Sequence, residues 1–316
     1  MKSIKIPLSV PNNKKSEYLK NYRWLTNNSG NLLLIAGDQK VEHLNDDFCG
    51  SGIAPEDKNP EHLFKIAAAS QGGVLATHLG LISRYGSDYR SLPYIVKING
   101  KTNLGAGEKN SSKLWWSVDD IIKFKKQSGL KVAAIGYTLY LGGLYEAKML
   151  KEAAKAIFAA HQAGLLAVLW VYPRGKNVKE EDIHTIAGGA GVAATLDADF
   201  VKLKYPYSAK NPKAAAIKFQ EAVEAAGRTK VICVGGDKRP VKEILEHLAN
   251  QINISKTGGM AIGRNLHQRS LEEATRLNAA LGAIIFHGKN AGEALAIYNT
   301  KTKAKKSLSF KFLGLF

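Results

Sequence analysis

The stretch LLAVLWVYPRG at residues 165–175 runs through eight apolar or aromatic residues before it reaches proline, arginine and glycine. A shorter run, DFVKLK at residues 199–204, follows after a stretch of helical character. Short β-rich runs that alternate with amphipathic helical stretches are typical of a parallel sheet. This part of the chain therefore predicts a strand, a helix and a second strand parallel to the first.

The same alternation extends along the chain in both directions. We expect strands at residues 31–37, 73–77, 94–98, 131–136, 165–172, 199–204, 230–235 and 259–262. Eight parallel strands are the number that closes a (β/α)8 barrel, a single domain of about 250 residues. The sequence thus predicts the α/β class and a TIM barrel over residues 31–285, with an N-terminal extension (1–30) and a basic C-terminal tail (286–316).

Helix boundaries between these runs carry recognisable signals. Ser117 and Asp120 are spaced as in a capping box, and Gly129 is placed to end that helix in a left-handed conformation. Asn211 followed by Pro212 predicts the start of another helix. The second strand is followed by only a short helical stretch, near residues 80–85.

Composition and charge narrow the class of protein. The 316 residues are 45% hydrophobic and include two cysteines, which is unlike a disulfide scaffold and favours a reducing, cytoplasmic compartment. The longest internal apolar stretch, residues 165–172, is too short to cross a membrane. The formal net charge of +18 admits attraction of a phosphorylated substrate or binding of nucleic acid. Basic residues are interspersed with acidic ones and accompany no nucleic-acid-binding motif, which disfavours a nucleic-acid partner.

Polar residues follow the strands at the C-terminal face, where barrels of this type carry their active sites. Lys202 and Lys204 are two residues apart on one strand, so their side chains share a face. Burial and a neighbouring charge such as Lys204 would lower the pKa of Lys202 and supply the neutral amine that Schiff-base formation requires. Solvated surface lysines are the alternative interpretation. Tyr172 and Asp38 are candidate proton-transfer groups, although a rim aromatic and a helix cap are ordinary roles for them.

Glycines and an arginine after the last two strands predict an anion site. Gly235 and Gly236 follow the seventh strand, and Gly263 and Arg264 follow the eighth. Backbone N–H groups approach an anion closely where glycine removes the side chain, and arginine binds phosphate through two parallel hydrogen bonds. Ordinary tight turns would use the same glycines, but the paired positions on strands seven and eight favour phosphate binding.

Metal-dependent chemistry is the main mechanistic alternative. His43, His78 and His267 fall near the expected barrel mouth, and three histidines can hold zinc. None of them has a partner at short spacing. We therefore expect neither a metal nor another cofactor.

Seven sequence blocks in these positions resemble the archaeal-type class I fructose-bisphosphate aldolases, which are related to the deoxyribose-phosphate aldolase-like Schiff-base barrels. The likeness extends from about residue 32 to residue 281, with each block at an expected strand end. The blocks are AGDQKVEH (36–43), VKINGKTNL (96–104), AIGYTLY (134–140), WVYPRG (170–175), ADFVKLKY (198–205), VGG (234–236) and IGRN (262–265).

The resemblance implies a role for each matched residue. Lys202 would be the Schiff-base lysine, Tyr172 the acid/base residue and Asp38 the aspartate that orients the lysine. Arg174 or Lys97 would meet a second phosphate of the substrate. The expected substrate contacts are Trp170, Lys204, Arg174, Gly235, Gly236, Gly263 and Arg264.

The implied activity is that of a carbon–carbon lyase of glycolysis and gluconeogenesis, acting in the cytoplasm as a homo-oligomer. It would cleave fructose 1,6-bisphosphate reversibly to dihydroxyacetone phosphate and glyceraldehyde 3-phosphate. Two departures from the family pattern, Gln39-Lys40 after Asp38 and Val234 before the glycines, leave the identity of the sugar open. The alternatives are the same lysine chemistry on another phosphorylated keto or acyl substrate, as in an aromatic-precursor synthase or a signal-molecule thiolase, and a non-catalytic barrel that binds nucleic acid.

Overall fold

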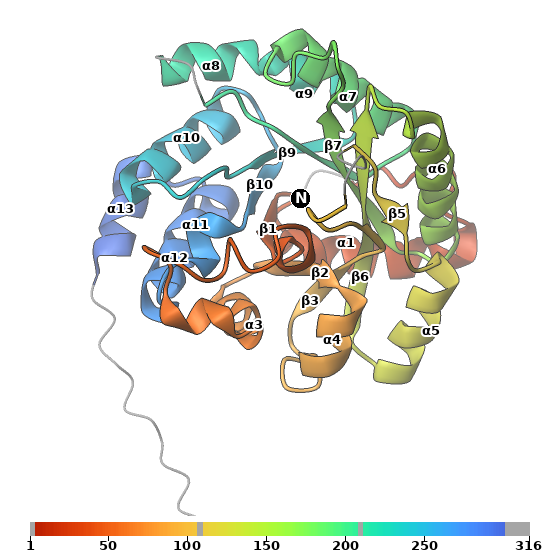
Figure 1. Ribbon diagram of the computed structural model, residues 1–316, viewed down its shortest axis with the longest axis horizontal. Helices are drawn as coiled ribbons and strands as arrows, with labels where there is room; N and C mark the ends of the chain where they lie inside the picture. The colour runs from red at the N-terminus through yellow and green to blue at the C-terminus, as the bar shows by residue number, and fades with distance from the viewer. Residues whose placement is uncertain (1–3, 106–109, 208–210, 301–316) are drawn as a thin grey trace, which may run out of the picture.

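A computed structural model describes residues 4–105, 110–207 and 211–300 and contains a closed barrel of eight parallel strands (Figure 1). Each strand pairs with the next strand of the barrel along the chain, and the last pairs with the first. The strands are β1 (Leu32–Ala36), β2 (Val74–His78), β3 (Pro93–Lys97), β6 (Lys131–Leu141), β7 (Leu166–Pro173), β8 (Phe200–Leu203), β9 (Lys230–Val234) and β10 (Gly259–Ile262).

The expected strands and the (β/α)8 fold are confirmed. Each of the eight apolar runs overlaps one barrel strand, and the run at residues 259–262 coincides with β10. The main difference is β6, which continues five residues beyond the run at 131–136 and ends at Leu141. The extra residues stay in register with β7, up to the pair Leu141↔Pro173, so inter-strand pairing sustains the strand into the barrel mouth.

Helices surround the strands, as Figure 1 shows. The capping box expected at Ser117 begins α5 (Val118–Ser128), and Gly129 follows that helix in the left-handed region at φ 64°. The Asn211 side chain caps α8 (Pro212–Lys218), as the pair Asn211-Pro212 predicts. The helices after the first strand are α2 (Gln39–Glu42), α3 (Glu61–Ala69), α4 (Leu79–Tyr85), α5 (Val118–Ser128), α6 (Glu146–Gln162), α7 (Ile183–Thr195), α8 (Pro212–Lys218), α9 (Gln220–Ala226), α10 (Val241–Asn253), α11 (Arg264–His267), α12 (Leu271–His287) and α13 (Ala291–Asn299).

The seam between β1 and β10 closes the barrel. Leu32 is paired with Gly259, and the backbone of Gly259 adopts φ +132°. A Cβ atom built on Gly259 would lie 2.0 Å from the carbonyl oxygen of Leu32. The close approach of the two strands therefore requires glycine at this position.

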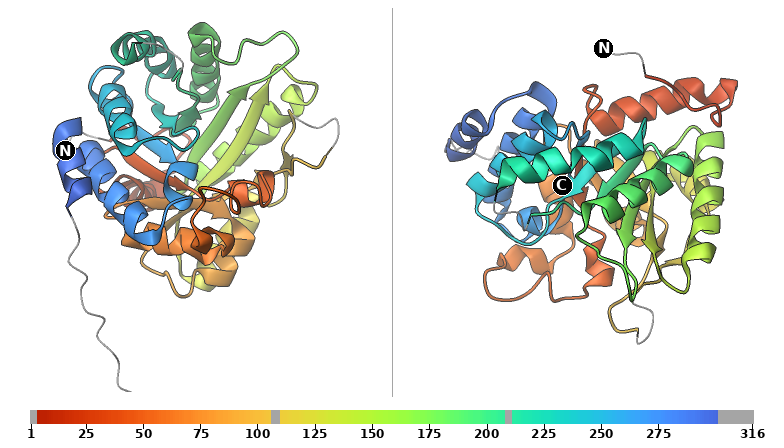
Figure 2. Two further views of the ribbon diagram at one scale, coloured as in Figure 1. Left: turned by 60° about the vertical axis from the view of Figure 1, so that its left-hand side comes forward. Right: turned by 90° about the horizontal axis from the view of Figure 1, so that it is seen from above.

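The N-terminal segment lies against the amino-terminal end of the barrel. Helix α1 (Lys15–Thr26) contributes Tyr18 and Leu25 to the same buried cluster as the barrel interior; Figure 2 shows it in red. Asp199 accepts hydrogen bonds from the Tyr18 hydroxyl and from the backbone N–H of Ala167, and its carboxylate lies 3.0 Å from His161 Nε2. This polar cluster joins α1, α6 and the start of β8.

The C-terminal part of the described chain is helical and packed. Helix α13 packs against α10 and α12, and Ala294 is buried there. The tail expected at residues 286–316 is described only as far as residue 300, so its lysines 301, 303, 305, 306 and 311 lie outside the described residues. In the part of the chain that can be described, no helix combines the length and apolarity needed to span a membrane.

Candidate active site

The interior of the barrel is the frame on which the site is built. Side chains along a strand alternate between the two faces, so every second residue of a barrel strand points inward. Ala36, Ala76, Ile95, Val168 and Phe200 all belong to the interior cluster. The residues two positions further along each segment are Asp38, His78, Lys97, Trp170 and Lys202, and all of them are buried.

Two of these interior residues are lysines that share one aromatic wall. Lys202, on β8, is 4% exposed, and Lys97, on β3, is 0% exposed. The Nζ atom of each lies 5.3 Å from the centroid of the Trp170 ring. Gly136 makes room for that indole, because a Cβ atom there would lie 2.5 Å from Trp170 Cζ3.

Ion pairing distinguishes the two lysines. Lys97 Nζ lies 3.7 Å from Asp38 Oδ2 and 3.8 Å from Glu42 Oε1. Among the described residues, no carboxylate oxygen lies within 4.0 Å of Lys202 Nζ. Lys97 therefore lies between two carboxylates, whereas Lys202 is buried without a carboxylate partner at this distance.

The surroundings of Lys202 favour its neutral amine. Burial lowers the pKa of Lys202; the Asp38 carboxylate opposes the shift, the Lys97 ammonium adds to it, and the net change is downward. Burial alone would raise the pKa of the Asp38 carboxyl, but Lys202 and Lys97 lower it overall. The site thus combines an amine of reduced basicity with a carboxyl group whose pKa is lowered.

Tyr172 is the proton-transfer candidate on the neighbouring strand β7. Its ring is stacked on that of Tyr140, with centroids 6.0 Å apart, and the Arg174 guanidinium carbon lies 4.9 Å from the Tyr172 ring centroid. Burial and the carboxylates of Asp38 and Glu42 raise the pKa of Tyr172 well above its usual value. The phenol is therefore a proton donor in the resting site.

The glycines and the arginine after β9 and β10 lie together. The Asn265 side-chain amide donates to the carbonyl oxygens of Gly235 at 3.0 Å and of Gly236 at 3.3 Å, which ties the two turns to each other. Gly236 adopts φ +68°, a left-handed conformation that favours glycine. A Cβ atom on Gly263 would lie 2.4 Å from Gln39 Nε2. Glycine at position 263 therefore leaves room for the side chain of Gln39, the residue that follows Asp38 in the chain.

Arg264 and Gly235 already have contacts within the protein. The Arg264 Nη1 atom lies 2.6 Å from Asp237 Oδ1, at a site where the Asp237 side chain is 80% exposed. The backbone N–H of Gly235 donates to the Ala261 carbonyl at 2.9 Å. An anion that bound here would have to displace the exposed Asp237 carboxylate from Arg264. It would also have to bind backbone N–H groups other than that of Gly235.

Lys204 does not lie beside Lys202. Strand β8 ends at Leu203, so the alternation that we extended to Lys204 stops before it. The Lys204 side chain is 41% exposed, and its Nζ atom lies 2.9 Å from Glu181 Oε1. The buried lysine near Lys202 is Lys97, for which the sequence predicts only a contact with a second phosphate.

The three histidines considered for zinc are not gathered. His43 pairs with Asp47, at 2.5 Å between Nδ1 and Oδ2, and His267 pairs with Asp57 at 2.7 Å. His78 packs its ring against Trp115, and burial together with the Lys97 ammonium lowers the pKa of His78 to about 4. Within the described ranges, no group of three or more His, Cys, Asp or Glu side chains is placed to hold a metal ion.

The family model and the relatives that match this chain all describe aldolases. Residues 32–269 match the model of the DeoC/LacD family aldolases. The chain is 52% identical over 298 residues to a protein of Methanocaldococcus jannaschii named fructose-bisphosphate aldolase/6-deoxy-5-ketofructose 1-phosphate synthase, covering 94% of this chain and 95% of the relative. It is 32% identical over 268 residues to a class 1 fructose-bisphosphate aldolase of Halobacterium salinarum, covering 84% and 94% of the two chains.

Solved structures agree. A fructose-bisphosphate aldolase from Slackia heliotrinireducens has a TM-score of 0.90 and 45% identity, with 94% of each chain covered. An archaeal fructose-1,6-bisphosphate aldolase, solved with its catalytic lysine covalently bound to a carbinolamine intermediate, has a TM-score of 0.72 and 29% identity, covering 85% of this chain and 99% of the other.

Proposed function

The chain belongs to the DeoC/LacD family of aldolases and is a carbon–carbon lyase, and we propose that it cleaves fructose 1,6-bisphosphate through an imine on Lys202. The products are dihydroxyacetone phosphate and glyceraldehyde 3-phosphate, and the reaction is reversible. The observation that carries the proposal is the difference between two buried lysines. Lys97 is ion-paired with Asp38 and Glu42, whereas Lys202 has a lowered pKa and, within the described chain, no carboxylate within 4.0 Å.

The reaction begins with attack of the neutral Lys202 amine on the C2 carbonyl carbon of the open-chain sugar. The carbinolamine loses water as Tyr172 donates a proton to the departing oxygen, which leaves a protonated imine. The Tyr172 phenolate then accepts the proton of the C4 hydroxyl as the C3–C4 bond breaks, and the bonding electrons move into the imine as an enamine. Protonation and hydrolysis of this enamine release dihydroxyacetone phosphate and restore Lys202.

Asp38 and Trp170 hold this chemistry in place. The Asp38 carboxylate lies 3.7 Å from Lys97, and its charge raises the pKa of Lys202, so Asp38 would orient the amines and stabilise the cationic imine. The Trp170 indole forms the wall against which Lys202 lies. The phosphate on C1 would bind between the turns of Gly235-Gly236 and Gly263-Arg264, with Arg264 leaving Asp237 to meet it.

A second candidate function has a specific observation in its favour. The Methanocaldococcus jannaschii relative that is 52% identical over 94% of this chain carries the name of a 6-deoxy-5-ketofructose 1-phosphate synthase as well as that of an aldolase. The same enamine on Lys202 would serve both reactions, because only the aldehyde that accepts it differs. We therefore treat this synthase reaction as the alternative for the same site.

Borohydride trapping tests the central step. The protein is incubated with dihydroxyacetone phosphate, reduced, digested and analysed by peptide mass spectrometry; we expect one reduced adduct, on Lys202. Lys202→Ala and Lys202→Arg should both be inactive and untrapped, since guanidinium does not form an imine. Lys242→Ala, on the exposed face of α10, is the matched control and should behave as the wild type. An adduct on Lys97, or full activity in Lys202→Ala, would contradict the proposal.

Location and assembly remain predictions. Cys49 and Cys233 are free thiols, which agrees with the reducing cytoplasm that we propose for this enzyme. The homo-oligomer is testable by light scattering after size-exclusion chromatography. If the charge of +18 instead served nucleic-acid binding, we would expect strongly salt-dependent retention of RNA without sugar turnover.

A further inference from the structure

His78 is a buried histidine in the barrel mouth whose ring nitrogens are not hydrogen-bonded. It is the last residue of β2 and follows the interior residue Ala76 by two positions, so its side chain points into the barrel. His78 is 9% exposed, and neither Nδ1 nor Nε2 has a hydrogen-bond partner among the described residues. Such a histidine is uncommon, because a buried polar group without a partner costs free energy.

The ordinary roles of a histidine at this place are not realised. His78 occupies the N-cap position of α4, yet its side chain makes no capping hydrogen bond. It belongs to no group of three or more potential metal ligands in the described part of the chain. The two ring nitrogens are therefore left for a bound molecule.

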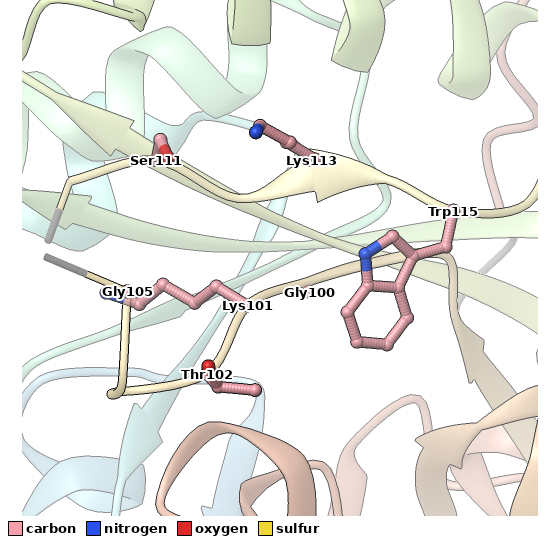
Figure 3. Close-up of a pocket in the computed structure, with 7 residues that line it drawn as sticks. All are labelled: Gly100, Lys101, Thr102, Gly105, Ser111, Lys113 and Trp115. Atoms are coloured by element: carbon pink, nitrogen blue, oxygen red, sulfur yellow. The ribbon is translucent and has the colours of Figure 1, made fainter. Parts of the chain in front are cut away.

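An indole holds the His78 ring in place. Trp115 follows β5 (Lys113–Leu114), which pairs antiparallel with β4 (Asn99–Gly100). Figure 3 shows its side chain beside Gly100, where a Cβ atom would lie 2.5 Å from the indole. The His78 ring packs against this indole, with the two centroids 4.8 Å apart. The imidazole thus has a fixed position.

The imidazole is neutral. Burial and then the positive charge of Lys97 lower the pKa of His78 to about 4, although the Asp38 carboxylate and the Lys97 backbone oppose the shift. At neutral pH the ring therefore has one N–H donor and one acceptor nitrogen. This combination suits a hydroxyl group, which can accept from the first or donate to the second.

His78 lies across the barrel from Lys202. Strands β1, β10 and β9 separate β2 from β8 on one side, and β3, β6 and β7 separate them on the other. In the proposed reaction C2 is bound to Lys202 and the phosphate on C1 lies at the turns after β9 and β10, so C4 to C6 extend toward the opposite wall. Lys202 is 4% exposed and has to meet the sugar, so an exposure of 9% does not bar His78 from the same substrate.

We propose that His78 binds the oxygen on C5 of the sugar and thereby selects the aldehyde that the enzyme uses. In the proposed reaction the C4 hydroxyl gives its proton to Tyr172 and C6 carries the phosphate, which leaves the C5 hydroxyl free. The sugars of the proposed and the alternative reaction also differ at this carbon, because 6-deoxy-5-ketofructose 1-phosphate has a ketone there. A hydroxyl can pair with either ring nitrogen, whereas a ketone pairs only with the N–H. This inference rests on the proposed function and deepens it.

The test measures aldol addition of dihydroxyacetone phosphate to two aldehydes in the wild type, His78→Leu and His78→Gln. Glyceraldehyde carries the hydroxyl that becomes the C5 hydroxyl, and 3-hydroxypropanal differs from it only in lacking that group. His78→Leu should lower kcat/KM about 10- to 100-fold for glyceraldehyde and less than about twofold for 3-hydroxypropanal. His78→Gln is similar in size and keeps a donor and an acceptor, so it should stay within about fivefold of the wild type on glyceraldehyde.

Two further measurements confine the effect to the C5 hydroxyl. Borohydride trapping of dihydroxyacetone phosphate on Lys202, and exchange of its hydroxymethyl proton with solvent deuterium, involve only the other half of the sugar. Both should stay within about twofold of the wild type in either variant. Fructose 1,6-bisphosphate and fructose 1-phosphate share the C5 hydroxyl, so His78→Leu should slow the cleavage of both sugars by the same factor.

The outcomes separate this inference from the function on which it rests. Equal losses on the two aldehydes, a loss on neither, or weaker trapping would overturn the role of His78 and leave the aldolase intact. A loss confined to the bisphosphate would also overturn it, because the contact would then be with the phosphate on C6. Equal kcat/KM of the wild type for the two aldehydes would do the same, and this comparison does not depend on how the variants fold. A wild type without an adduct on Lys202 would overturn the proposed function and this inference together.

Discussion

Lys97 and Lys202 place their amino nitrogens at the same distance, 5.3 Å, from the centroid of the Trp170 ring. Only Lys97 has carboxylate oxygens within 4 Å, those of Asp38 and Glu42, among the residues described. Two chemically identical side chains on one wall are thereby differentiated: Lys97 is ion-paired, and its positive charge lowers the pKa of Lys202. We therefore expect the reactivity proposed for Lys202 to depend on both lysines.

Lys97→Met should shift the activity to higher pH. Without the neighbouring ammonium, and with Asp38 left as an unpaired anion, the pKa of Lys202 rises. A rise of one unit lowers the fraction of neutral amine about tenfold below the pKa. The acid limb of the kcat/KM–pH profile should therefore move upward, and so should the pH dependence of borohydride trapping.

Lys97→Arg keeps a positive charge and serves as the comparison for that variant. It should retain an acid limb closer to that of the wild type even if its larger side chain lowers kcat. An acid limb at the same pH in Lys97→Met and wild type would show that Lys97 does not act on Lys202.

Gly136→Ala should damage both stability and activity. The new Cβ would lie 2.5 Å from Trp170 Cζ3, so the indole must move from the lysine pair. Overpacking of this kind costs about 1–3 kcal/mol of unfolding free energy. Gly188→Ala is the matched change at an exposed position of α7, where an added Cβ meets nothing within 4 Å, and should raise stability by about 0.5–1 kcal/mol. Urea unfolding of the two variants measures the contrast; a Gly136→Ala protein as stable and active as the wild type would refute it.

Arg264→Ala should weaken both sugars alike. Arg264 adjoins Gly263 and the turn after β9, which would hold the phosphate common to fructose 1-phosphate and fructose 1,6-bisphosphate. Loss of a two-point contact should raise KM about 10- to 100-fold for each. Steady-state kinetics with both sugars check this. An effect confined to the bisphosphate would instead assign Arg264 to the second phosphate.

The substitution His161→Gln should lower the free energy of unfolding less at high pH than at low pH. Burial lowers the pKa of His161, but Asp199 and Asp197 raise it more, so the folded-state pKa lies above 6.5. A raised histidine pKa contributes stability that is fully present below about pH 6.5 and is lost as the pH rises through the folded value. The difference in unfolding free energy between wild type and variant should therefore shrink from pH 6 to pH 9. A difference that is constant across this range would contradict the assignment.

The positions of the strands followed from local sequence, because a buried parallel strand is a short apolar run between helices. The length of β6 did not, since residues 137–141 are held in the sheet by pairing with β7. The prediction that Lys204 shares a face with Lys202 is wrong for a similar reason. Alternation predicts the face of a side chain only within a strand, and β8 ends at Leu203.

Two parts of the site needed the three-dimensional structure. Lys97 and Lys202 come from strands that are not adjacent in the barrel, so nothing in their spacing reveals that both reach Trp170. Each lysine lies two residues after an apolar interior residue, Ile95 or Phe200. This spacing in the sequence could have identified both lysines as interior residues. Trp115 is different: it follows β5 (Lys113–Leu114), which pairs with β4 (Asn99–Gly100) and brings Trp115 to His78, and two-residue strands leave no periodic signal.

The seam at Leu32 and Gly259 also sets when this protein becomes an enzyme during its synthesis. Asp38 follows the first barrel strand and Arg264 follows the last, so the ribosome must translate nearly the whole barrel before the two can meet. Until β10 arrives, β1 lacks one of its two neighbours, and non-local pairing of this kind forms slowly. A nascent chain that contains Lys202 but not β10 therefore lacks the closed barrel, and we expect an enclosed site around Lys202 only after translation of the barrel is complete.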